Sequence, residues 1–415
     1  MTERTLILSD TNSGSLPDVA PPPRAAPGTI ILTMVVAYSL LLSLAFALFR
    51  SSLATVAGSE MSVHRAMFFA VNAGTNTGFQ TSVTVESLRP AARIASLLLM
   101  IAGALLSWIA GGWLVARAIA LTVSFKQLAI YSAALLLLAV LAGGGLLVSG
   151  DRWSATFQGI SAVCNGGVWI GDSPAISHQR TAMVLVPLAV LGGLGITVVI
   201  ELTKLFRRQL SNHAITTLAA IAGVYLFGVL AVLTGQWFAA AVSGDNWRDV
   251  VSHASLLSLN SRSAGLPVEL LGTLDRPTQW TTAILMLVGA GSGGAGGGLK
   301  VTSLVIAFAG VIALLRDRRP ARAFAIALCW IAAHLTLIAI TWWLLLGMVA
   351  EQTADRLLML AISAAGNVGL SHDVVSATGN DALILSATML AGRLLPLAFL
   401  YWLSRVPQED QIALA

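Results

Sequence analysis

Long apolar runs dominate the chain and alternate with shorter polar stretches. Each run has about 20 residues or more, which is enough for a helix to cross a hydrocarbon core about 30 Å thick. We therefore expect an all-α integral membrane protein. The pattern predicts about eight spanning helices, near residues 29–50, 92–120, 127–149, 180–205, 214–242, 278–315, 321–349 and 381–404.

Four connections between these runs are segments of mixed polarity that are too short and too polar to span a membrane. They cover residues 60–90, 151–179, 246–277 and 353–380. Each begins with a short helical pattern and ends in small residues, closed by a glycine and an apolar residue. The closing glycines lie roughly 100 residues apart, and a fixed spacing of this size indicates internal repeats. These glycines are Gly78, Gly167, Gly265 and Gly369.

The spacing predicts four units of span, short helix, turn and span, at residues 29–120, 127–205, 214–315 and 321–405. The polar segment 1–28 is rich in proline and serine, which is typical of a disordered tail, and 406–415 forms a second short tail. Basic residues gather in alternate connections and after the last span. By the positive-inside rule these connections and both termini are expected to be cytoplasmic.

The composition agrees with a lipid-embedded chain. Hydrophobic residues make up 56% of the 415 residues and charged residues only 10%, whereas soluble domains carry about 25% charged residues. The net charge of +5 comes with basic residues that lie between apolar runs, so we expect no nucleic-acid partner. Cys164 and Cys329 lie in apolar segments without metal-ligand spacing, which favours small buried side chains.

The four glycine-closed turns suit a carbonyl-lined pore. A helix that enters a membrane partway leaves backbone groups unpaired, which is tolerated only inside protein or beside a water-filled cavity. Carbonyl oxygens from such turns can replace the water shell of an ion. Glycine adopts the backbone angles that turn successive carbonyls toward one axis. The matched positions favour this interpretation over four unrelated turns.

The turns "TNTGF", "CNGGV", "RSAGL" and "GNVGLS" resemble the four filter sequences of the Trk/Ktr/HKT superfamily of potassium transporters. "VLGGLGITVVIEL" resembles the outer helix of the second repeat in that family, and "AGRLLPL" resembles its last helix. The resemblance covers about residues 30–405. It departs in the first repeat, whose second helix lacks GGLG, and at Val168. The resemblance implies a potassium filter of backbone carbonyls at Thr75, Asn76, Thr77, Gly78, Cys164, Asn165, Gly166, Gly167, Ser263, Ala264, Gly265, Asn367, Val368 and Gly369.

Residues 289–298 hold seven glycines and a GxGxxG pattern. A dinucleotide-binding enzyme is one interpretation, but its fingerprint needs a strand before the glycines and an amphipathic helix after them. Both flanks here are apolar membrane patterns, so we expect no enzyme. The stretch instead predicts a spanning helix, the second of the third repeat, broken by an unwound glycine-rich loop.

The resemblance implies that this loop is an intramembrane gate. Arg393 lies deep in the last span, and the resemblance implies that it faces the pore and contacts the gate. A fixed positive charge near a cation path raises an electrostatic barrier to the ion. The alternative is that Arg393 forms an ion pair with Glu201. Arg262 is expected behind the filter, paired with Glu269 or Asp275. The gate residues are Gly289, Gly291, Gly293, Gly294, Gly296, Gly297, Gly298, Lys300 and Arg393.

In the family, serine in place of the first filter glycine goes with sodium transport, so the four glycines favour potassium. A sodium- or mixed-cation-conducting member is the alternative, and four similar units disfavour a secondary transporter with a central site. We expect no cofactor in this chain. The resemblance implies a homodimer in the lipid of the inner cell membrane and a separate cytoplasmic regulatory subunit that binds NAD or ATP.

Overall fold

The computed structural model describes residues 27–55, 60–146, 151–171, 179–205, 210–238, 247–262, 266, 270–320, 322–349 and 351–403. These residues form helices joined by loops, with two isolated β-bridges and no strand. The expected all-α fold class is confirmed. The predicted tail 406–415, and all but the end of the tail 1–28, lie outside the described residues.

Six helical stretches are long and apolar enough to cross a membrane. Large apolar side chains point outward along them, such as Leu44, Leu141 and Phe227, each more than 60% exposed. A helix that is apolar all round suits lipid, so the chain is a multi-pass membrane protein. The helices are α1 (Pro27–Phe49), α3 and α4 (Pro90–Leu105 and Gly112–Ala118, taken together), α5 (Phe125–Leu146), α9 (Asn212–Phe238), α13 (Arg322–Met348) and α15 (Asn380–Leu403).

The continuous span expected over 180–205 is wrong. The helix breaks between α7 (Gln179–Gly193) and α8 (Ile196–Leu202), and the two parts meet at an angle of 113°. At the break Gly195 has a φ of 99°, a left-handed value that glycine adopts without steric cost. Counted as one, this bent pair is a seventh span.

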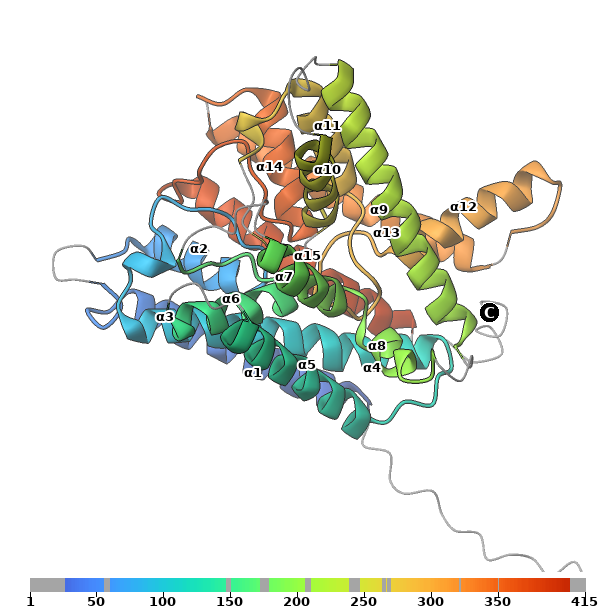
Figure 1. The fold of residues 1–415 in the computed structure, drawn as a ribbon, viewed down its shortest axis with the longest axis horizontal. Helices are drawn as coiled ribbons and strands as arrows, with labels where there is room; N and C mark the ends of the chain where they lie inside the picture. Colours follow the sequence, from blue (N-terminus) through green and yellow to red (C-terminus); the bar gives the residue numbers. More distant parts are fainter. Residues whose placement is uncertain are drawn as a thin grey trace, which may run out of the picture.

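The span expected over 278–315 is broken, as predicted. It consists of α11 (Arg276–Met286) and α12 (Val301–Leu315), separated by residues 287–300, which we call the glycine-rich loop. α12 is a shorter apolar helix that falls below the length of the six spans. It lies at the right of Figure 1, where it packs against α13 and α9.

A π-helical segment, Leu106–Gly111, joins α3 to α4. This segment lies where the first repeat lacks GGLG, and there the helix continues as one span, Pro90–Ala118, rather than breaking. π-helical turns inside α-helices occur frequently at functional sites.

Four short helices occupy the mixed segments of the sequence. Buried residues cover most of their C-terminal halves. Figure 1 shows α2 and α6 on one side of the molecule and α10 and α14 on another. The division of the chain into four repeats stays a prediction. The short helices are α2 (Val63–Gly74), α6 (Arg152–Cys164), α10 (Trp247–Asn260) and α14 (Ala354–Gly366).

Candidate functional site

Three of the short helices end in the same backbone conformation. The residue that follows the helix, or the next one, is an asparagine with left-handed φ, and a glycine with positive φ comes two residues later. Asparagine is one of the few residues with a side chain that visit this region. The pairs are Asn76 and Gly78 (φ 55° and 77°), Asn165 and Gly167 (54° and 61°), and Asn367 and Gly369 (49° and 86°). We call residues 75–78, 164–167 and 367–369 the three turns.

The three turns meet at one place in the molecule. A Cβ atom added to Gly167 would lie 2.7 Å from the Cα atom of Gly78, and one added to Gly369 would overlap the carbonyl oxygen of Thr77. Such distances leave no room for a side chain. The structure therefore brings together the predicted filter residues of the first, second and fourth segments.

The third predicted filter segment, Ser263, Ala264 and Gly265, lies outside the described residues. Its neighbours are described: the Leu266 amide donates to Asn260 Oδ1 at 3.1 Å. The filter role of all four segments stays a prediction.

Buried side chains fix the first turn. Asn72 on α2 accepts from the Phe79 amide at 2.9 Å and donates to the Phe79 carbonyl at 3.1 Å. The Thr75 and Thr77 hydroxyls lie 2.7 Å apart. Buried polar groups with matched partners hold a local structure rigidly.

Equivalent bonds fix the other two turns. Ser161 Oγ donates to the Val168 carbonyl at 2.7 Å, and Asn165 Nδ2 donates to the Ala189 carbonyl at 2.9 Å. Asn367 Nδ2 donates to Thr77 Oγ1 at 3.0 Å and to the Met389 carbonyl at 2.9 Å. Asn367 thus ties the last turn to the first.

Three glycines of the second helices also belong to the site, and the sequence reasoning missed their role. A Cβ atom on Gly103, Gly192 or Gly392 would overlap the carbonyl oxygen of Gly74, Val163 or Ala365, at the end of the neighbouring short helix. The signal was available, because each of these glycines follows its turn glycine by about 25 residues.

The glycine-rich loop touches the last turn and the broken helix. A Cβ atom on Gly297 would lie 2.7 Å from Asn367 Oδ1. The Gly291 amide donates to the Gly193 carbonyl at 2.9 Å, and the base of the loop is closed by the Gly289 amide, which donates to the Leu299 carbonyl at 2.8 Å. The predicted gate residues thus lie together, next to the turns.

Two cations donate to loop carbonyls. Arg393 on α15 is only 3% exposed; its Nη1 donates to the Ala295 carbonyl and its Nη2 to the Gly103 carbonyl at 2.8 Å. Lys300 Nζ donates to the Gly296 carbonyl at 2.5 Å. The alternative partner for Arg393, Glu201, accepts instead from the Ser211 amide at 2.9 Å.

Two smaller expectations need correction. Arg262 does not pair with Asp275: its Nη1 donates to the Ile221 carbonyl at 3.0 Å, and Asp275 caps α11 by accepting from the Thr278 amide. The other expected partner, Glu269, lies outside the described residues. Cys164 is buried as expected, but Cys329 is exposed, because it lies on an outward side of a spanning helix.

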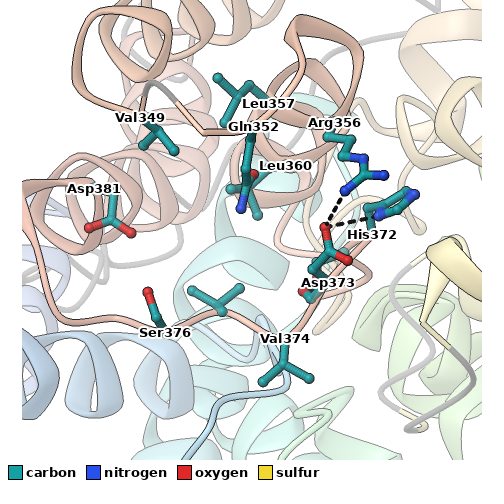
Figure 2. A pocket seen from close by; sticks show the side chains of 12 residues that line it. Val349, Gln352, Arg356, Leu357, Leu360, His372, Asp373, Val374, Ser376 and Asp381 are labelled. Atoms are coloured by element: carbon teal, nitrogen blue, oxygen red, sulfur yellow. Dashed lines mark hydrogen bonds and ion pairs between the residues drawn. The ribbon is translucent and has the colours of Figure 1, made fainter.

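A cavity of about 150 Å³ lies beside the segment that follows the last turn. Figure 2 shows Arg356 and His372 both pointing toward Asp373, at 3.2 and 2.9 Å from its Oδ2. The Arg356 and Asp373 side chains are 41% and 48% exposed, and ion pairs this exposed contribute little stability. The cavity lies outside the meeting point of the turns.

The segment beside this cavity is held mainly by its backbone. The Gly272 amide donates to the His372 carbonyl at 3.1 Å, and the Val375 amide donates to the Gln80 carbonyl at 3.0 Å. These bonds link it to residues that follow α10 and to residues that follow the first turn. The cavity wall therefore braces the last turn from outside.

No family model matches the chain. The Ktr system potassium uptake protein B of Vibrio alginolyticus is 27% identical over 271 residues, which is 60% of this chain and 59% of that protein. The protein of the same name from Bacillus subtilis is 25% identical over 309 residues, 69% of this chain and 68% of that protein. The chain thus matches about three fifths of the length of the Vibrio relative.

The fold matches the crystal structure of the potassium transporter TrkH from Vibrio parahaemolyticus with a TM-score of 0.69. The match has 16% identity and covers 93% of this chain and 86% of that chain. These relatives are transporters rather than enzymes, and residues 281–286, needed as a strand by the dinucleotide interpretation, are helical in α11. The sequence similarity to the Ktr proteins and the fold shared with TrkH confirm the resemblance to the Trk/Ktr superfamily of potassium transporters.

Proposed function

We propose that the chain takes up potassium across the cytoplasmic membrane through a path lined by the backbone carbonyls of the turns. The observation that carries this proposal is the convergence of the three turns, each with a left-handed asparagine and a positive-φ glycine. This alternation turns successive carbonyls in a common direction, as an ion filter requires. The potassium named in the titles of the relatives supports the choice of ion.

The glycine-rich loop is the gate in this proposal. It lies against the last turn at Gly297 and receives hydrogen bonds from Arg393 and Lys300. The cationic groups that donate to these loop carbonyls would compete with a permeating cation for the same oxygen atoms. Opening therefore requires the bond from Arg393 to the loop, and the bond from Lys300 within it, to break.

The proposal includes the surroundings of the chain. Basic residues in alternate connections support cytoplasmic termini in the inner cell membrane. The resemblance to the superfamily supports a homodimer and a separate cytoplasmic subunit that binds NAD or ATP. Co-purification of a second, nucleotide-binding chain from the native host, and the mass of the membrane complex, test these two points.

The direct test is growth of a bacterium that lacks its own potassium uptake, on low-potassium medium. The wild-type chain should restore growth. Gly78→Ser should lower the preference for potassium over sodium at least tenfold, because a side chain at φ 77° is strained and meets the Gly167 backbone. A sodium- or mixed-cation transporter, the second candidate, would instead show uptake of sodium by the wild type.

A further inference from the structure

The break between α7 and α8 frees backbone groups that a continuous helix would use. In such a helix the carbonyls of Gly192 and Gly193 would accept from the amides four residues later. Here they accept from the glycine-rich loop instead: Ala295 donates to Gly192 and Gly291 donates to Gly193, both at 2.9 Å.

The exchange also runs in the other direction. The amide of Ile196, the first residue of α8, donates to the Gly293 carbonyl at 3.3 Å. A Cβ atom on Gly195 would overlap the carbonyl oxygen of Ser292. The loop therefore completes the broken helix, and the broken helix supplies the loop with hydrogen bonds that its own glycines cannot make with side chains.

Trp108 fixes the carbonyl at the centre of this exchange. It is fully buried in the π-helical segment, and its indole Nε1 donates to the Gly192 carbonyl at 3.0 Å. The same oxygen accepts from the Ala295 amide, while the Ala295 carbonyl accepts from Arg393. Ala295 is thus held through both its backbone groups.

We propose that the helix break and Trp108 form a seat that holds the glycine-rich loop across the ion path, and that Trp108 is a positioning residue which acts through the Gly192 carbonyl. This inference rests on the proposed function, since it names how the gate is held. In this proposal the break between α7 and α8 holds the loop closed. The loop opens only when its backbone hydrogen bonds to the broken helix are lost. It also couples the gate to the first predicted repeat, because Trp108 lies between α3 and α4 of that repeat.

The test removes the indole N–H and keeps an aromatic ring, although a smaller one, in the full-length protein in proteoliposomes. Trp108→Phe should raise hydrogen exchange of the loop amides, measured on peptides that cover residues 287–300, by about 2- to 10-fold, the equilibrium effect of one lost hydrogen bond. Basal potassium flux should rise by a similar factor. The potassium-to-sodium flux ratio should stay unchanged, because the turns are not touched.

Trp113→Phe is the matched control. Trp113 lies in the same span, and the Arg117 guanidinium lies over its ring, 4.5 Å from the ring centroid. It should leave loop exchange and flux unchanged. The second variant carries the benzothiophene analogue of tryptophan at position 108, which replaces only the N–H by sulfur and keeps the shape of the ring, and it decides alone if Trp108→Phe does not fold.

The outcomes separate the two proposals. Unchanged loop exchange in both Trp108 variants overturns the seat, whatever the flux. Faster exchange with unchanged flux overturns the positioning of the gate by Trp108. A wild-type protein that conducts no potassium overturns the proposed function, and loop exchange then still decides whether the seat exists.

Discussion

The three turns and the glycine-rich loop both contain positive-φ glycines in close backbone contact, but they are held differently. Side chains in or next to the turns hold them through hydrogen bonds. Asn72 bonds to the residue after the first turn, Ser161 bonds to the residue after the second, and Asn367 links the last turn to the first. The loop is held by main-chain groups of a neighbouring helix, by Arg393, and by bonds within the loop itself, from Lys300 to Gly296 and from Gly289 to Leu299. Half of the 14 loop residues are glycines, which have no side chain that could anchor them.

This difference teaches what glycine does in each place. In the turns, glycine permits three backbones to meet, and the surrounding side chains make the arrangement rigid. In the loop, the glycines provide no side-chain anchors, so the position of the loop depends largely on its contacts with neighbouring segments. A substitution in the turns should therefore damage the structure, whereas loss of a neighbour of the loop should release it.

The largest effect is expected for Gly167→Ala. Its φ of 61° is unfavourable for alanine, and the added Cβ would lie 2.7 Å from the Gly78 Cα. Strain and overpacking together should cost about 2–5 kcal/mol and abolish potassium uptake. Thermal unfolding of the purified protein and uptake in cells measure the two effects.

Gly145→Ala is the control for that substitution. Gly145 lies in α5, and a Cβ atom there would meet nothing within 4 Å. Alanine is also the better helix former, by about 1 kcal/mol. We expect unchanged uptake and equal or higher thermal stability, and a loss of uptake as large as that of Gly167→Ala would contradict the role of close contact in the turns.

The next effect, on the loop, is expected for Arg393→Gln. The substitution removes the charge and the two-pronged donor that joins the Ala295 carbonyl to the Gly103 carbonyl. A hydrogen bond from a charged group contributes about 1.5–3 kcal/mol, so we expect basal potassium flux in proteoliposomes to rise about tenfold or more.

Arg393→Lys separates tethering from electrostatics. Lysine keeps the charge but cannot reproduce the planar fork of arginine. If the loop is tethered by the fork, the lysine variant should conduct nearly as much as the glutamine variant. Flux at the wild-type level with lysine would mean that charge alone limits conduction, and the contrast between turns and loop would then lose its basis.

The spans could be predicted because lipid exposure requires an apolar surface along a whole helix, and α1, α5 and α13 carry that requirement in their composition. The short helices and their turn glycines followed from spacing. The predicted gate residues, which the resemblance implied, lie together in the structure, but their partners were not predicted. Arg393 could be assigned to the interior, whereas its bond to Ala295 depends on how two distant segments fold together.

The break at Gly195 shows where a single sequence stops being informative. "VLGGLGITVVIEL" is apolar on both sides of the glycines and is compatible with a straight span. The helix breaks because Gly291 and Ala295, about 100 residues later, supply the missing amides. The π-helical segment is likewise not evident from its own sequence, and the partner of Trp108 within it is a carbonyl on another helix, α7.

The smallest effect sharpens the comparison within the turns themselves. Asn367 and Asn76 have the same left-handed backbone, which glycine adopts freely, so substitution by glycine removes only the side chain. Asn367→Gly loses two donated hydrogen bonds and should destabilise the protein by about 2 kcal/mol. Among the described residues neither amide atom of the buried Asn76 has a partner, so Asn76→Gly should change stability by less than about 0.5 kcal/mol.

Thermal unfolding of the two variants in the same detergent measures this difference. A larger loss for Asn367→Gly means that side-chain bonds between turns, and not the left-handed backbone alone, make the meeting point rigid. Equal losses would contradict that view, because they would place the rigidity in the backbone, where the turns and the glycine-rich loop are alike. The contrast between the fixed meeting point of the turns and the releasable loop then depends on which neighbours contact each of them. Asn367 joins the two regions, because it lies in a turn and also borders Gly297 of the loop.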